Sequence, residues 1–158
     1  MSEIKLYAGV GARTSPPHII TTMTKIASLL ASKSYLLRSG GAKGADSAFE
    51  TGCDSVGGLK EIFTKNSYIP PEAFDLAASV HPAWNKCSPI ARRLHGRNSM
   101  IILGKNLNTP VNAVICYTPK GKIIGGTGNT IRIAKKYNIP IINLAENPEY
   151  EFIMTDFN

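Results

Sequence analysis

The sequence predicts an α/β protein in which a mainly parallel sheet lies between two layers of helices. Two observations predict this fold class. Short apolar segments typical of buried strands alternate with amphipathic helical segments along the chain, and glycines gather where several strands pass into the next helix. The 158 residues, 43% hydrophobic and 18% charged, have the size and composition of one globular domain, predicted over 1–158.

The first strand is predicted over 4–10, an apolar segment that runs into Gly9 and Gly11. Ser15 followed by Pro16 predicts the N-cap and the first position of a helix, because serine can accept a hydrogen bond from the first helical amides and proline needs no amide partner there. Apolar residues then recur at helical spacing as far as Leu30. This is the first strand–glycine–helix unit.

A second unit follows in the same order. A short strand over 35–38 ends in the glycine-rich segment 39–46, from which a helix continues until Gly52, the residue expected to end it. A third strand is predicted over 59–63, and a short helix or irregular segment over 72–79.

The second half of the chain repeats this alternation. Ser88 and Pro89 predict the start of a helix that Gly104 ends. A strand over 112–117 and a loop lead into the glycine-rich segment 125–129 and a further helix, and a strand over 139–144 completes the sheet. Because helical crossovers join parallel strands and are right-handed, the chain is predicted to form a Rossmann-like three-layer sandwich.

Eight of the fourteen glycines form three clusters that follow predicted strands. These are Gly9 and Gly11; Gly40, Gly41 and Gly44; and Gly125, Gly126 and Gly128. The carboxyl ends of parallel strands share one edge, so the three loops are expected to converge on one crevice. Glycine lets backbone amides approach an anion, and each helix N-terminus adds positive potential, so phosphate is the predicted ligand. The first cluster lacks the third glycine of a dinucleotide fingerprint and is equally well explained as a tight turn, and the second lacks the Walker A spacing.

The formal charge of +7 is unevenly distributed along the chain. Residues 76–145 contain ten Lys or Arg and no Asp or Glu, whereas the rest has eight basic and eleven acidic residues. This asymmetry indicates a phosphate-bearing partner on one side of the molecule. The alternative is a solvated basic surface that only aids solubility.

Individual side chains in and after these loops are candidates for binding. Arg97 can grip a phosphate at two positions, although an exposed helix arginine explains it as well. Lys43 and Arg132 can add positive charge, and Arg13 follows the first glycine cluster directly. Asp46 either accepts a hydrogen bond from a sugar hydroxyl or favours the N-terminus of its helix.

The segments 39–46, 97–101 and 125–128 together resemble the superfamily that joins DNA-processing protein A with the lysine-decarboxylase-like phosphoribohydrolases. Residues 39–46 are similar to the Ser-Gly-x-Ala-x-Gly-x-Asp segment of DNA-processing protein A, and Arg97-Asn98 with its apolar continuation is similar to that family's Arg-Asn-x-x-Ile segment. The resemblance implies a Rossmann-like domain that binds single-stranded DNA or a nucleotide phosphate, usually as a dimer. It adds Ser39, Gly40, Gly41, Lys43, Gly44, Arg97 and Asn98 to the candidate binding positions.

The phosphoribohydrolase branch hydrolyses the N-glycosidic bond of nucleoside monophosphates and uses a Gly-Gly-x-Gly-Thr-x-x-Glu motif. In this chain Asn129 stands at the threonine position and Arg132 at the glutamate position, so a cation replaces the expected carboxylate. Hydrolysis would need another carboxylate, for which Asp46 and Glu50 are the candidates near a glycine loop.

The leading hypothesis is a protein without metal or cofactor that binds a nucleotide, or single-stranded nucleic acid, through its phosphate in this crevice. The alternatives are an N-glycosidase acting on nucleoside 5′-monophosphates, with Asp46 or Glu50 as tentative catalytic residues, and a protein that sequesters a small nucleotide signal. The predicted binding residues are Gly9, Gly11, Arg13, Ser39, Gly40, Gly41, Lys43, Gly44, Asp46, Arg97, Asn98, Gly125, Gly126, Thr127, Gly128, Asn129 and Arg132.

Cellular location and assembly are also expected from the sequence. The start of the chain lacks a charged leader before an apolar stretch, and no apolar run approaches the roughly 20 residues that span a bilayer, so no membrane partner is expected. Cys53, Cys87 and Cys116 are an odd number with no close pair, which suits a reducing, cytoplasmic location and predicts neither a disulfide framework nor a zinc site. A homodimer or higher homo-oligomer is expected.

Overall fold

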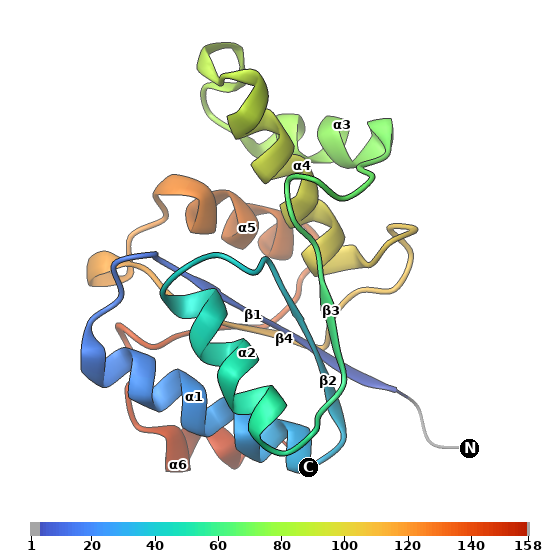
Figure 1. The fold of residues 1–158 in the computed structure, drawn as a ribbon. Coiled ribbons are helices and arrows are strands. Elements are labelled where there is room, and N and C mark those ends of the chain that lie inside the picture. The colour runs from blue at the N-terminus through green and yellow to red at the C-terminus, as the bar shows by residue number, and fades with distance from the viewer. Residues whose placement is uncertain (1–3, 158) are drawn as a thin grey trace.

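Five parallel strands form one sheet in the order β3-β2-β1-β4-β5 in the computed structural model, which describes residues 4–157 (Figure 1). The strands are β1 (Lys5–Gly11), β2 (Tyr35–Ser39), β3 (Lys60–Ile62), β4 (Ala113–Tyr117) and β5 (Ile141–Asn143). The chain first moves outward from β1 to β3 and then returns to the other side of β1 for β4 and β5. The predicted parallel α/β architecture is therefore confirmed.

The helices cover both faces of this sheet (Figure 1). The helices α1 (Pro17–Ser32), α2 (Ala45–Ser55) and α6 (Tyr150–Met154) lie on one side of the sheet, and α4 (Pro89–Leu103) and α5 (Gly125–Lys136) lie on the other. The helix α3 (Pro71–Val80) packs against α4 and α5. Two short 3-10 helices, η1 (Trp84–Lys86) and η2 (Pro119–Gly121), lie in connections. None of the helices within residues 4–157 is both long and apolar enough to cross a bilayer.

Alternation of side chains along the central strands builds the two cores. In β1, Tyr7 enters the core beneath α1 and α2, while Ala8 enters the core beneath α4 and α5. In β4, Ile115 and Val114 divide between the same two cores. Both faces of a central parallel strand are buried, which explains why these segments are apolar throughout.

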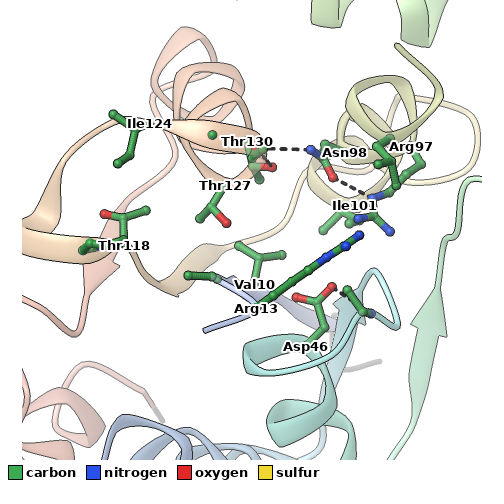
Figure 2. Close-up of a pocket in the computed structure, with 17 residues that line it drawn as sticks. Val10, Arg13, Asp46, Arg97, Asn98, Ile101, Thr118, Ile124, Thr127 and Thr130 are labelled. Atoms are coloured by element: carbon green, nitrogen blue, oxygen red, sulfur yellow. Dashed lines mark hydrogen bonds between the residues drawn. The ribbon is translucent and has the colours of Figure 1, made fainter. Parts of the chain in front are cut away.

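The switch in strand order between β1 and β4 positions the candidate site. The connections that leave these two strands emerge at the same edge, and there they line a pocket (Figure 2). In open parallel sheets this is the place where ligands usually bind, because the two connections turn away in opposite directions and leave a crevice between them.

Several predicted boundaries need correction. The helix α1 has Pro16 as its N-cap, whereas the Ser15 hydroxyl donates to the Ala12 carbonyl. The helix α2 continues past Gly52 to Ser55. An added Cβ at Gly52 would lie 2.2 Å from the Thr24 carbonyl oxygen of α1, so this glycine permits close packing of two helices. The Ser88 cap is confirmed, since its Oγ accepts from the Ala91 amide at 3.1 Å.

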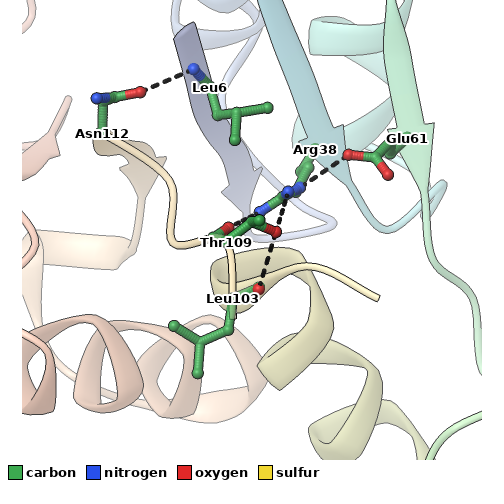
Figure 3. Close-up of polar contacts among 6 residues, drawn as sticks. All are labelled: Leu6, Arg38, Glu61, Leu103, Thr109 and Asn112. Atoms are coloured by element: carbon green, nitrogen blue, oxygen red, sulfur yellow. Dashed lines mark hydrogen bonds and ion pairs between the residues drawn. The ribbon is translucent and has the colours of Figure 1, made fainter. Parts of the chain in front are cut away.

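A buried arginine joins the sheet to the connection between α4 and β4 (Figure 3). Arg38 of β2 is only 3% exposed. Its Nε donates to Glu61 Oε1 at 3.0 Å, its Nη2 donates to Thr109 Oγ1 at 2.9 Å, and its Nη1 donates to the Thr109 carbonyl. These hydrogen bonds satisfy the buried guanidinium and tie Glu61 and Thr109 to β2.

Replacing Arg38 with methionine is expected to lower the free energy of unfolding by about 2–3 kcal/mol, because the Thr109 carbonyl loses its charged donor while the aliphatic packing is largely kept. Urea unfolding measures the change. Lys105→Met, at an exposed position after α4, is the matched control and should change stability by less than about 0.5 kcal/mol. Equal stabilities for the two variants would contradict the assigned role of Arg38.

Candidate functional site

The pocket at the carboxyl edge has a volume of about 540 Å³. The end of β1 with the β1–α1 connection, helix α4, and the β4–α5 connection with the first turns of α5 supply most of its wall (Figure 2). The loop before α2 and the first turn of α2 supply the remainder. Its lining residues are Val10, Gly11, Ala12, Arg13, Ala42, Asp46, Leu94, Arg97, Asn98, Ile101, Thr118, Pro119, Ile124, Gly125, Gly126, Thr127 and Thr130. Two arginines and one aspartate are the charged members of this set.

Arg97 is held at the pocket wall by the backbone around it. Its Nη1 donates to the carbonyls of Gly40 at 2.8 Å and Phe63 at 3.0 Å, and its Nε donates to Asn98 Oδ1 at 2.7 Å. The residue is 9% exposed. Burial lowers the pKa of this guanidinium, and the neighbouring Asp46 opposes the shift. The three hydrogen bonds fix the guanidinium before any ligand binds.

Gly40 explains how this arginine reaches its position. A Cβ at Gly40 would lie 2.4 Å from Arg97 Nη1 and 2.7 Å from Asp46 Oδ2. Any larger residue would therefore separate the guanidinium from the carboxylate. Although Gly40 does not line the pocket, its lack of a side chain lets two charged groups pack against the loop after β2.

Asp46 lies in the first turn of α2 and is 4% exposed. Burial raises the pKa of this carboxyl to about 6, and Arg97, the amides of Ala42 and Gly40, and Arg13 oppose the shift. One carboxylate oxygen accepts from the Ala42 amide at 3.3 Å. The Asp46 carboxylate is therefore the partner of amides in the loop before α2, which a ligand anion would otherwise contact.

Arg13 approaches the same place from the opposite wall. Figure 2 shows its side chain reaching from the β1–α1 connection toward Arg97 and Asp46. Arg13 is exposed, and its charge lowers the pKa values of both Arg97 and Asp46. Two guanidinium groups of like charge thus converge, an arrangement that an anion between them would stabilise.

The N-terminus of α5 forms the remaining polar wall. Gly125, Gly126 and Thr127 line the pocket, and Asn98 Nδ2 donates to the Gly126 carbonyl at 3.3 Å. The space beside the first two residues is open, because an added Cβ at Gly125 or Gly126 would meet no atom within 4 Å. The segment predicted as a loop is the first turn of the helix itself, and its first three residues lie at the pocket wall.

The structure brings eight of the predicted site residues into the pocket wall. They are Gly11, Arg13, Asp46, Arg97, Asn98, Gly125, Gly126 and Thr127. The others lie outside the lining: Gly9, Ser39, Gly40, Gly41, Lys43, Gly44, Glu50, Gly128, Asn129 and Arg132. The three glycine clusters therefore converge only in part.

Several of the outlying residues have packing partners. Gly9 lies inside β1 against the Phe49 ring, and Ser39 Oγ donates to the Gly9 carbonyl at 2.6 Å. Glu50 accepts from Lys60 Nζ at 2.8 Å, on the side of α2 toward β3.

The polar residues of the α5 helix also have partners away from the pocket. Asn129 is fully buried, and its amide nitrogen donates to the Ala77 carbonyl of α3 at 3.4 Å. Arg132 Nη2 donates to the Ile123 carbonyl at 3.0 Å. These side chains connect α5 to α3 and to the segment that precedes α5.

Sequence reasoning missed the apolar part of the site. Leu94, Ile101 and Ile124 line the pocket beside Val10, and Thr118 lies where β4 ends. Thr118 is fixed by Asn143 of β5, whose Nδ2 donates to Thr118 Oγ1 at 2.8 Å. The sequence does offer one sign that Thr118 belongs to the site. It directly follows a predicted strand, at the edge of the sheet where the glycine loops are expected.

The fold and the position of the pocket define a Rossmann-like α/β protein with a pocket at the switch point of its sheet. Among solved structures, this fold is shared with DNA processing protein A (DprA) from Streptococcus pneumoniae and from Helicobacter pylori. Both match with a TM-score of 0.61 at 20% identity over 89% of this chain. The match covers 50% of the first protein and 64% of the second, so this chain spans about half to two-thirds of their length.

A second group of structures has the same fold. The molybdenum cofactor (Moco) carrier protein of Chlamydomonas reinhardtii matches with a TM-score of 0.59 at 12% identity, over 99% of this chain and 86% of that one. No family model matches the sequence, and no curated protein matches it significantly. The resemblance to DNA-processing protein A is thus confirmed at the level of the fold.

Proposed function

We propose that the pocket binds the phosphate of a nucleotide or of single-stranded nucleic acid. The observation that carries this proposal is the convergence of Arg13 and Arg97 beside the open N-terminus of α5. Two guanidinium groups and the first amides of a helix are the groups that bind phosphate oxygens most strongly in proteins. The DNA processing protein A of Helicobacter pylori, which shares this fold, binds single-stranded DNA, and this supports the same ligand class.

The phosphate is expected to lie against α5. The amides of the loop before α2 already contact the Asp46 carboxylate, which would repel a second anion there. The first turn of α5 lies on the other side of the pocket and has open space beside Gly125 and Gly126. Arg13 extends toward the middle of the pocket, where it can reach an anion held by those amides.

The rest of the ligand is expected to be a single nucleotide unit. A volume of about 540 Å³ lies within the range of small-molecule sites and is too confined for a duplex. Val10, Leu94, Ile101 and Ile124 provide apolar surface for a base. Because a long duplex contact would need an extended basic face, the small pocket favours a mononucleotide or an unpaired nucleotide of a longer strand.

Hydrolysis of an N-glycosidic bond is a second candidate function, supported by one observation. Asp46 is the acidic residue of the pocket lining, and its raised pKa of about 6 allows it to exchange a proton near neutral pH. Glu50 is paired with Lys60 outside the pocket. Incubation with nucleoside monophosphates distinguishes the functions, since hydrolysis releases free base and simple binding or sequestration leaves the nucleotide intact.

A binding panel of nucleoside monophosphates and short single-stranded oligonucleotides tests the leading proposal. Arg13→Ala is the sharpest variant, because this exposed guanidinium makes no hydrogen bond within residues 4–157 and its removal should leave the fold intact. Affinity should fall about 10-fold or more, since one charge-assisted contact is lost, and it should weaken with increasing salt.

Lys25→Ala, which removes an exposed cation from α1, is the matched control and should bind as the unmodified protein does. Salt-insensitive binding, or equal affinities for the Arg13 and Lys25 variants, would contradict a phosphate site in this pocket.

A further inference from the structure

Three metal-ligating side chains meet at one end of the α3–α4 layer, outside the pocket lining. His81 directly follows α3, Cys87 directly follows η1, and His95 lies in α4. The turn through η1 folds the chain back, so that one potential ligand atom from each residue lies within 4.8 Å of the others. None of the three lines the phosphate pocket.

The separations within this cluster suit a small metal ion. Cys87 Sγ lies 3.6 Å from His81 Nε2. A thiolate and an imidazole on tetrahedral zinc are separated by about 3.6 Å, given Zn–S near 2.3 Å and Zn–N near 2.0–2.1 Å. The rings of His81 and His95 have centroids 4.6 Å apart, with an interplanar angle of 63°. Small side-chain rotations would therefore direct all three ligands at one point.

A buried nitrogen without a partner supports this interpretation. His95 is 8% exposed, and within residues 4–157 its Nδ1 has no hydrogen-bond partner. Buried polar atoms are rarely left unsatisfied, so this nitrogen is a candidate for a ligand. A neutral imidazole offers a lone pair to a metal ion and is a common zinc ligand.

The protons in the cluster determine what a metal must displace. His81 Nδ1 accepts from the Ala83 amide at 2.9 Å, so the proton of the neutral ring lies on Nε2 and faces Cys87. Ligation through Nε2 moves this proton to Nδ1 and breaks the hydrogen bond from the Ala83 amide, while the Cys87 thiol releases its proton to solvent. One proton is therefore released for each ion bound.

We propose that His81, Cys87 and His95 bind one Zn²⁺ ion, with a water molecule as the fourth ligand. Two imidazoles and a thiolate are ligands for a borderline-soft ion, and the cluster offers no carboxylate of the kind that Mg²⁺ or Ca²⁺ requires. The thiolate offsets part of the positive charge that the ion adds near Arg132. The ion would join the end of α3 to α4 and stabilise the segment between them.

The chain contains an intrinsic reporter for this site. Trp84 is the single tryptophan, and its ring centroid lies 6.1 Å from that of His81 and 6.2 Å from that of His95. Titration of the full chain with Zn²⁺ at pH 7.5 should change the fluorescence of Trp84 and saturate at one equivalent. Co²⁺, used as a spectroscopic substitute, should produce a thiolate-to-cobalt charge-transfer band, and Zn²⁺ should raise the melting temperature.

Cys87→Ser and His81→Asn are the test variants, each at a half-exposed position where folding can be checked by circular dichroism. Either should weaken Zn²⁺ binding about 100-fold or more, and the first should abolish the charge-transfer band. Cys53→Ser and His18→Asn are matched controls, since they change a thiol in the core and an imidazole exposed on α1.

The controls should bind Zn²⁺ as the unmodified chain does. The proposal is overturned if the unmodified chain fails to bind one equivalent at micromolar concentration, or if the test variants bind as tightly as the controls. If one test variant fails to fold, the other decides. The readouts do not involve a nucleotide, so this result is independent of the phosphate site.

Discussion

Replacing Arg97 with alanine is expected to lower the free energy of unfolding by about 3–5 kcal/mol and to weaken phosphate binding about 100-fold or more. The stability loss follows from burial: the carbonyls of Gly40 and Phe63 lose their donor, and the Asp46 carboxylate loses the cation beside it. The binding loss is expected because the guanidinium also faces the pocket. Urea unfolding and calorimetry with a nucleoside monophosphate measure the two effects.

Arg97→Lys separates charge from geometry. A lysine keeps the positive charge near Asp46 but cannot donate simultaneously to Asn98, Gly40 and Phe63 as the planar guanidinium does. The lysine variant should recover less than half of the unfolding free energy that the alanine variant loses. A loss below about 1 kcal/mol in the alanine variant would show that the backbone carbonyls find other partners, and would remove the structural role assigned to Arg97.

The fold was predictable from the sequence because its signals are local. Apolar strand segments alternate with segments of helical spacing, and Ser88 forms a real cap on α4, which begins at Pro89. The errors occur where a tertiary contact overrides a local preference. Gly52 has the properties of a helix terminus, yet it is the contact point between α2 and α1 and lies inside the helix. A single sequence contains no sign of that contact.

The site was predictable only in part, for the same reason. The convergence of loops at one edge follows from parallel topology, and it correctly places Arg13, Asp46 and Arg97 around one pocket. How each side chain is used depends on neighbours distant in the sequence. Asn129 and Arg132 have the spacing of pocket residues but bond to carbonyls away from the pocket wall. The cluster around His95 needs the turn through η1 to assemble.

Replacing Asp46 with asparagine is expected to change how stability depends on pH. Burial raises the pKa of Asp46 in the folded protein from its ordinary 3.8 to about 6. Between these two values the folded chain keeps the proton that the unfolded chain releases, so the Asp46 contribution to stability falls as the pH rises from about 4 to 6. The difference in unfolding free energy, asparagine variant minus unmodified protein, should therefore rise by about 2 kcal/mol over this range.

The same substitution should tighten anion binding at pH 7.5, because it removes the negative charge that faces Arg97 and Arg13 across the pocket. An oligonucleotide without a terminal phosphate is the suitable probe, since its phosphodiesters do not titrate in this range. Its affinity for the unmodified protein should increase as the pH falls from 7.5 to 5.5, and affinity for the Asp46→Asn variant should stay nearly constant. Weaker binding by the variant would instead indicate that the ionised carboxylate accepts a hydrogen bond from the ligand, as expected if Asp46 orients a sugar hydroxyl.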